Sequence, residues 1–339
     1  MTSDQCKTQL SLWESDSDPF QTLRGANDTS SSQTGKLSDA GHRTAGKRVV
    51  SAAEELRVTP STQQVINVAS VPHRSPFRYP GGKTWLVPYV RRWLISLPSR
   101  AKEFAEPFAG GAIVGLSMLF EELTERLTLV ELDDDVAAVW KTVLSPRAKD
   151  LVRRIASFEM THKAVIKVLE NRSTDTSVRA FATILRNRVQ RGGIMAPGAS
   201  LMKAGENGRG LRSRWYPQTL TNRILAIAEK RAQITFLHGD AIQHIRERAK
   251  RPELVFFIDP PYTVAGRRLY VHSEVNHEEL FRIMSSVRGD VLMTYDDAQP
   301  IRELAQKYGF DLEIVAMKNT HHEVMTELLI GKNLEWLRR

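Results

Sequence analysis

The residues Val255-Phe256-Phe257-Ile258-Asp259-Pro260-Pro261-Tyr262 form a short apolar run that ends in a carboxylate, two prolines and an aromatic ring. Four to eight apolar residues that stop at proline predict a buried strand reaching the rim of a sheet. Open α/β sheets bind their ligands at the carboxyl ends of the strands. The run therefore predicts an α/β fold in which Asp259 lies at a strand end and faces a cleft.

The four residues that end this run suit the binding of an amino group on a planar base. Asp259 carries an acceptor-only carboxylate, and the carbonyl of Pro260 is a second acceptor. Two acceptors can hold the two amino hydrogens while the ring of Tyr262 stacks on a base taken out of its helix. A surface turn at the end of a strand explains the same tetrad equally well.

A glycine turn and a later carboxylate predict a βαβ unit that holds a nucleoside. Residues 103–112 are typical of a strand that passes through a glycine turn into a helix. The next strand, 127–130, ends at Glu131, about 20 residues past the glycines, where a carboxylate can bind two ribose hydroxyls. Asp133 is expected to cap the helix that follows. The turn departs from Gly-x-Gly-x-x-Gly, so NAD is a poor second choice.

Three motifs, taken together, resemble those of the N6-adenine DNA methyltransferases. They are Pro80 to Lys83, Phe108 to Gly111 and Asp259 to Tyr262. Their order resembles the alpha group of that family, and the resemblance runs from about residue 77 to about residue 330. It implies a Rossmann-like sheet of an S-adenosylmethionine-dependent methyltransferase with a helical DNA-recognition insertion.

The resemblance also implies the roles of individual residues. The catalytic residues would be Asp259, Pro260, Pro261 and Tyr262. The ligands of S-adenosylmethionine would be Tyr79, Lys83, Phe108, Gly110, Glu131 and Asp240. Without the resemblance, Lys83 and the helix after it suit a carboxylate group, and Asp240 serves equally well as the N-cap of the helix from Ala241.

The positive charge of the chain is concentrated in residues 145–231. This segment has 18 Lys and Arg against 6 Asp and Glu, a net charge of +12, where the whole chain has +9. Such a segment is typical of a surface that binds a polyanion, although a solvated helical surface is the plainer alternative. A loop rich in glycine and arginine follows its helical part, and Trp215 and Tyr216 would either contact DNA or pack the loop onto the core. The candidate DNA ligands are Asn187, Arg188, Arg191, Arg212 and Arg214.

These features divide the chain into three parts. Residues 1–72 are polar enough to predict a disordered tail, residues 73–144 and 232–335 a catalytic domain, and residues 145–231 the recognition insertion. No apolar run reaches the roughly 18 to 20 residues of a membrane span, so we expect a cytoplasmic, nucleoid-associated protein. The single cysteine, Cys6, excludes an internal disulfide framework. No metal site is expected, despite His321 and His322.

The expected reaction is methyl transfer from S-adenosylmethionine to N6 of an adenine flipped out of double-stranded DNA. Methylation of N4 of cytosine makes the same demands on the site, and the charge does not exclude RNA as substrate. A DNA-binding protein with a degenerate cofactor site is a further alternative, against which Lys83, Gly110, Glu131 and Asp240 argue. The sequence does not reveal an oligomeric state, the target site or a restriction endonuclease partner.

Overall fold

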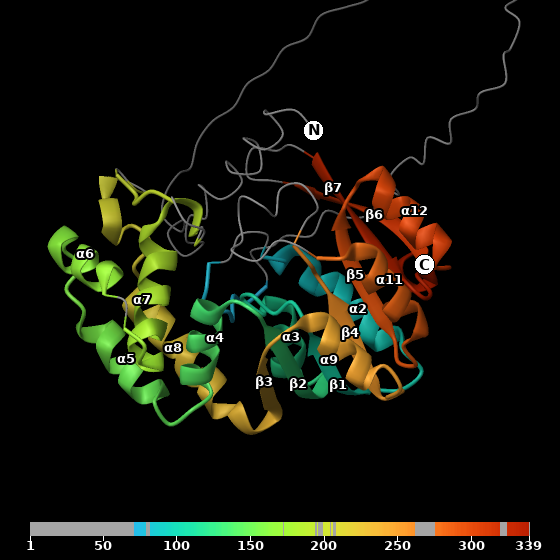
Figure 1. Ribbon diagram of the computed structural model, residues 1–339, viewed down its shortest axis with the longest axis horizontal. Helices are drawn as coiled ribbons and strands as arrows, with labels where there is room; N and C mark the ends of the chain where they lie inside the picture. The colour runs from blue at the N-terminus through green and yellow to red at the C-terminus, as the bar shows by residue number, and fades with distance from the viewer. Residues whose placement is uncertain are drawn as a thin grey trace, which may run out of the picture.

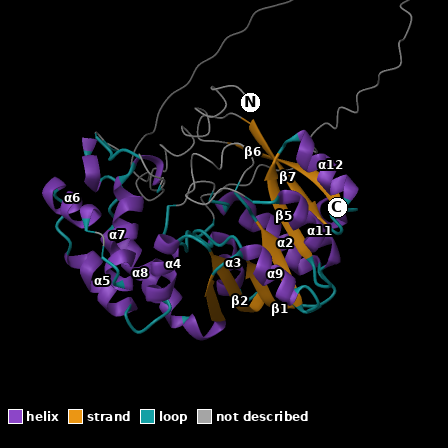
Figure 2. Cartoon of the chain, viewed as in Figure 1, coloured by secondary structure: helices purple, strands orange, loops and turns teal. Residues whose placement is uncertain are grey.

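The computed structural model describes most of the chain from residue 71 onward. The described residues are 71–78, 82–171, 173–193, 195, 199–203, 205, 208–261, 275–318 and 324–338. Most of the predicted tail lies outside them, as do Tyr79, Tyr262, residues 263–274, and the pair His321 and His322. Figure 1 and Figure 2 show a sheet with its covering helices on one side and a group of helices on the other.

The described strands form one seven-stranded sheet in the order β3-β2-β1-β4-β5-β7-β6. The first five of these are parallel, and β7 is antiparallel to both of its neighbours. The last two strands of the chain close one edge of the sheet as an antiparallel pair, in which β7 lies between β5 and β6. The strands are β1 (Ala101–Glu106), β2 (Thr124–Glu131), β3 (Ile234–His238), β4 (Leu254–Ile258), β5 (Val291–Asp296), β6 (Asp311–Lys318) and β7 (Val324–Gly331).

The sheet is buried on both faces, which is why β4 reads as a continuous apolar run. Val255 and Phe257 belong to the apolar core of one face, whereas Phe256 and Ile258 belong to the core of the other. This alternation is the period of two that a strand imposes on its side chains. One core is covered by α2 (Val87–Ser96), α3 (Ile113–Phe120) and α4 (Asp134–Val143), and the other by α9 (Ala241–Arg248), α11 (His277–Ser286) and α12 (Gln299–Lys307).

A group of helices between α4 and β3 stands beside the sheet (Figure 1). Its apolar core is continuous with that of one sheet face. Asp135 of α4 accepts hydrogen bonds from Arg179 and Arg186, which ties the group to the sheet side. The helices are α5 (Ala148–Ser157), α6 (His162–Glu170), α7 (Thr176–Val189) and α8 (Pro217–Glu229). The shorter helices of the described chain are η3 (Thr84–Leu86), η4 (Arg191–Gly193), η6 (Gly210–Arg212), η7 (Arg231–Gln233) and α13 (Glu335–Arg338).

Gly289, just before β5, allows a close backbone approach that the sheet requires. A Cβ atom at this position would lie 1.8 Å from the carbonyl oxygen of Leu254. Because backbone on both sides must then move, we expect Gly289→Ala to lower the free energy of unfolding by about 3 kcal/mol. Gly239→Ala is the control, since nothing lies within 4 Å of the Cβ it adds. Urea unfolding measures both variants, and equal stabilities would contradict the geometry.

Candidate active site

Four acidic side chains lie at the ends of neighbouring parallel strands. Glu106 and Glu131 end β1 and β2, while Asp240 and Asp259 follow β3 and β4. Because parallel strands point the same way, the carboxyl ends of all four strands lie side by side; this side of the sheet is called the carboxyl edge below. The structure thus brings Glu131, Asp240 and Asp259, which the sequence singled out, to the carboxyl ends of the parallel strands, and it adds Glu106 to them.

A buried lysine lies between two carboxylates at this edge. Lys83 is 3% exposed, and its Nζ atom donates hydrogen bonds of 3.0 and 2.7 Å to Oε1 and Oε2 of Glu327. The same Nζ atom lies 3.5 Å from Oδ1 of Asp259. The hydroxyl of Thr294 donates to Oε2 of Glu327 at 2.9 Å. The ammonium of Lys83 is therefore engaged by protein carboxylates, and its predicted contact with a cofactor stays a prediction.

Glu327 was missed in the sequence. It reaches the site because β7 is antiparallel, so the first half of this strand lies beside the carboxyl ends of the others. In the register of β5 and β7, Glu327 is opposite Asp296. The available signal was a single carboxylate within an otherwise apolar run, Glu327-Leu328-Leu329-Ile330, since such a residue is rarely buried without a partner.

Burial favours the neutral forms of Asp259 and Asp296. Burial raises the pKa of Asp259 to about 7; the ammonium of Lys83 opposes the rise and the carboxylate of Glu327 adds to it. Burial would lower the pKa of Lys83, but Asp259 and Glu327 outweigh it and raise that pKa. Burial also raises the pKa of Asp296, and the charge of Glu327 adds to that rise. An Asp259 that titrates near neutrality can hold or release a proton during a reaction at neutral pH.

Glu131 closes the glycine turn onto the end of β2. Its Oε2 accepts the N–H of Gly110 and its Oε1 the N–H of Asp133, both at 2.9 Å. Gly110 has a positive φ of 45°, a conformation that glycine adopts without strain. Burial raises the pKa of Glu131 to about 7. Asp133 accepts from the N–H groups of residues 135 and 136, so its predicted role as the N-cap of α4 is confirmed.

Glu106, the last residue of β1, is almost fully buried. Its Oε2 accepts the N–H of Gly115 at 2.8 Å, and a Cβ atom on Gly115 would lie 2.6 Å from that oxygen. Burial raises the pKa of Glu106 to about 8, and the charge of Asp259 contributes to the rise. Phe108, a predicted cofactor residue in the glycine turn, is half-buried and packs against the core that α9, α11 and α12 cover.

Two residues near Glu131 remain open to solvent. Asp240 is exposed and caps α9 by accepting the N–H of Gln243 at 2.7 Å, as the simpler interpretation of the sequence predicted. Leu132 is 45% exposed, and Ile95 is the one large apolar side chain of the described residues that is more exposed. An exposed leucine beside a glycine turn offers an apolar surface to a flat ring. The sequence alone gave no signal for it.

The predicted DNA ligands separate into buried and exposed groups. Asn187 and Arg188 are 1% and 3% exposed. Asn187 exchanges hydrogen bonds with the backbone of Arg78, at 2.9 and 2.8 Å, and Arg188 donates to the carbonyl of Pro76 at 2.8 Å. Burial lowers the pKa of Arg188 to about 9, and the positive charges of neighbouring arginines contribute to this decrease. This pair therefore holds residues 76–78 against α7.

The remaining candidates lie on the loop after α7. Arg214 is 5% exposed, whereas Arg191 and Arg212 are exposed. Trp215 is buried with its ring centroid 5.9 Å from that of Phe158, which favours the structural interpretation of this aromatic residue over DNA contact. Contact with DNA stays a prediction for all five candidates, and the exposed two present their side chains most directly.

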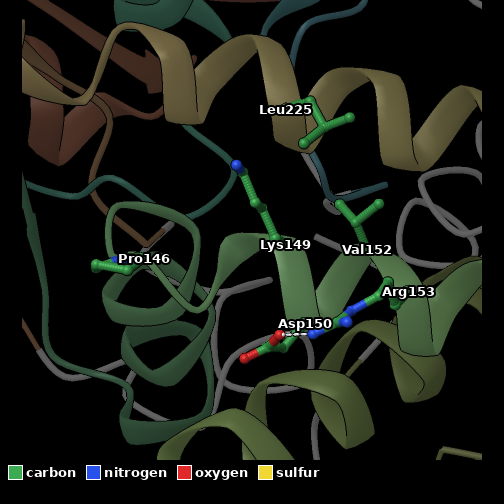
Figure 3. A pocket seen from close by; sticks show the side chains of 6 residues that line it. All are labelled: Pro146, Lys149, Asp150, Val152, Arg153 and Leu225. Carbon is green, nitrogen blue, oxygen red and sulfur yellow. Dashed lines mark hydrogen bonds and ion pairs between the residues drawn. The ribbon is translucent and has the colours of Figure 1, made fainter.

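A pocket on the helical group lies apart from the strand ends. Figure 3 shows side chains from the start of α5 and from α8 around it. It is lined by Pro146, Lys149, Asp150, Val152, Arg153 and Leu225, none of which is a candidate site residue. Within the described ranges, no three metal-ligating side chains gather as a metal site would require. No helix of those ranges is both long and apolar enough to cross a membrane.

The sequence of the chain was compared with those of known families and proteins. The profile of a family described as D12 class N6 adenine-specific DNA methyltransferase matches residues 79–320. No curated protein sequence matches the chain.

Several solved structures are similar at low identity. An rRNA methyltransferase, aviRa from Streptomyces viridochromogenes, is 13% identical over 83% of this chain and 90% of that one, with a TM-score of 0.34. A precorrin-6y C5,15-methyltransferase from Geobacter metallireducens is 10% identical over 72% and 84%, with a TM-score of 0.32. Spermidine synthase from Thermotoga maritima is 9% identical over 80% and 60%, also with a TM-score of 0.32.

Proposed function

The chain belongs to the D12 class N6 adenine-specific DNA methyltransferase family, whose profile spans residues 79–320, and we propose that it methylates N6 of adenine in double-stranded DNA. The methyl donor in this proposal is S-adenosylmethionine. The observation that carries the proposal is the position of Asp259, at a strand end inside the matched range, on the same edge as the glycine turn and Glu131.

Asp259 and Pro260 act on the amino group of the target base. The carboxylate and the Pro260 carbonyl accept its two hydrogens, which directs the nitrogen lone pair away from them. Bound S-adenosylmethionine would supply an electrophilic methyl group on its sulfonium. The methylated nitrogen becomes positively charged and must lose one proton, and the carboxylate of Asp259 stabilises that charge and can accept the proton. Tyr262, outside the described residues, is proposed to stack on the base.

The residues around the glycine turn fit a bound S-adenosylmethionine. The carboxylate oxygens of Glu131 accept the backbone N–H groups of Gly110 and Asp133, and their further lone pairs suit the two ribose hydroxyls. Leu132 provides an apolar surface for the adenine ring. The oxygen of Asp240 that does not cap α9 is available to the adenine amino group. We propose Tyr79, Phe108 and Gly110 as further contacts.

Loss of the Glu131 carboxylate should weaken binding of S-adenosylmethionine. We expect Glu131→Ala to raise the Kd about 10- to 100-fold, because it removes two hydrogen bonds to a charged acceptor. Isothermal titration calorimetry measures the Kd. Glu125→Ala is the matched control, since this glutamate lies on the same strand and is exposed. An unchanged Kd for Glu131→Ala would contradict the assignment.

Residues 145–231 are proposed as the part that recognises DNA. The support is a net charge of +12 in this segment and the exposure of Arg191 and Arg212. We expect Arg212→Gln to weaken binding to all duplexes and to lower the slope of log K against log salt by about 1. Fluorescence anisotropy at several salt concentrations tests this. Lys102→Gln, which changes an exposed residue at the amino-terminal end of β1, is the control and should keep the wild-type slope.

Mapping of modified bases tests the proposed reaction. The protein is expressed in a host without DNA methylation, and modified bases are located in its genomic DNA by single-molecule sequencing. N6-methyladenine in one short motif would support the proposal. Detection of N4-methylcytosine would instead identify cytosine as the substrate base. Unmodified DNA with intact cofactor binding would favour RNA as the substrate, or a DNA-binding protein without activity.

A further inference from the structure

We propose that Glu327 is a positioning residue of this site: it holds Lys83 as a counter-ion near Asp259 but away from the oxygens that must accept the substrate amino group. The inference rests on the proposed function, in which Asp259 binds that group. Glu327 itself lies beyond the residues matched by the family profile.

The contacts of Lys83 are unequal. Both oxygens of Glu327 lie within 3.0 Å of its Nζ atom, whereas Oδ1 of Asp259 is 3.5 Å away. A charge-assisted N–H···O bond is normally about 2.7 to 2.9 Å long, so Glu327 is the close partner and Asp259 the distant one. At that separation the ammonium still favours an ionised Asp259 but leaves its lone pairs largely accessible.

The position of the Glu327 carboxylate is fixed by its surroundings. Glu327 is 6% exposed, and its Oε2 also accepts the hydroxyl of Thr294 on β5. Its strand is hydrogen-bonded on both sides, to β5 and to β6. Because these partners fix the carboxylate, the ammonium of Lys83 would lose its two hydrogen bonds to Glu327 if it moved toward Asp259.

Among the described residues, the other ionisable groups facing Asp259 are acidic. They come from β1, β5 and β7, and they are Glu106, Tyr295 and Glu327, with Asp296 next to Glu327. Lys83 is the cation that the described residues place against this group. The balance between Lys83 and Glu327 therefore adjusts the pKa of Asp259, which burial has already raised, and it decides whether the oxygens of Asp259 are free.

Two substitutions should move the titration of Asp259 in opposite directions. In Glu327→Gln the amide keeps the shape and the hydrogen bond from Thr294, but it no longer repels Asp259 or retains Lys83. Lys83 then closes on Asp259, whose pKa falls by about one unit. Lys83→Met removes the cation, and the pKa of Asp259 rises by a similar amount.

The first test measures Asp259 directly, without any reaction. Full-length protein with ¹³C-labelled aspartate is titrated by NMR, and Asp259→Asn identifies the signal. Opposite shifts in Glu327→Gln and Lys83→Met support the inference. An Asp259 signal that titrates alike in wild type and Glu327→Gln overturns it, whether or not the protein methylates DNA.

The second test uses the reaction, with unmethylated genomic DNA and S-adenosylmethionine. We expect Glu327→Gln to lower kcat about 10-fold or more, to move the acid limb of kcat to lower pH, and to keep the Kd for S-adenosylmethionine within about twofold. Glu313→Gln on β6, whose carboxylate pairs with Arg338, is the control and should match wild type. A parallel loss of cofactor affinity, or a loss of kcat with an unmoved acid limb, overturns the inference. Absence of methylation by wild type counts against the proposed function alone.

Discussion

Asp259→Ala should reduce methyl transfer at least about 1,000-fold while S-adenosylmethionine still binds. The carboxylate contributes most when the amino nitrogen becomes positively charged, and removal of one such preorganised group costs about 10² to 10³ in kcat. Loss of the proton acceptor adds to this. The fold should persist, because Lys83 keeps its two shorter hydrogen bonds to Glu327 and is not left as an unpaired buried charge.

Methylation of unmethylated DNA and calorimetry with S-adenosylmethionine measure the two effects separately. Asp259→Asn is a second variant that keeps the shape of the side chain and removes its charge. Asp297→Asn is the matched control, because Asp297 follows the end of the next strand, β5, and its carboxylate pairs with Arg302. If Asp259→Ala kept wild-type turnover, the assigned role of the tetrad would be wrong.

The sequence was sufficient for the parts of the site that follow directly from strand ends. The apolar run at 255–258 is part of β4, and the helix expected from Ala241 to Arg248 has those bounds in the structure. In a parallel sheet, a residue just after a strand lies at the carboxyl edge whatever the strand order. Asp259, Glu131 and Asp240 could therefore be located without knowledge of tertiary contacts.

The partners of these residues could not be predicted from the sequence in the same way. Lys83 and Glu327 are 244 positions apart, and their contact depends on the insertion of β7 between β5 and β6. Asn187 binds the backbone of Arg78, 109 positions away, although its sequence context suggested DNA contact. A polar side chain on a basic helix looks the same in sequence whether it meets solvent or another segment, because burial is a property of the folded chain.

Raising the pH from about 6.5 to 8 should destabilise the protein. Burial raises the pKa of Glu106 to about 8, and burial raises the pKa values of Glu131 and Asp259 to about 7. In this window the folded protein retains protons that the unfolded chain has lost, so the free energy of unfolding falls with pH, by up to about 1.4 kcal/mol per pH unit for each group. Below pH 6.5 the effect is opposed, because burial lowers the pKa values of His73 and His244 to about 3 and about 4.

Glu106→Gln isolates the largest contribution. The amide oxygen can still accept the N–H of Gly115, but the side chain no longer ionises, so stability should depend less on pH and exceed that of wild type at pH 8. Urea unfolding at half-unit steps between pH 6.5 and 8 measures the slope, with the exposed Glu125→Gln as control. Equal slopes in wild type and Glu106→Gln would mean that Glu106 is already ionised at pH 6.5. The buried carboxylate would then be stabilised by more than the single N–H of Gly115, and its charge would add to the repulsion at Asp259.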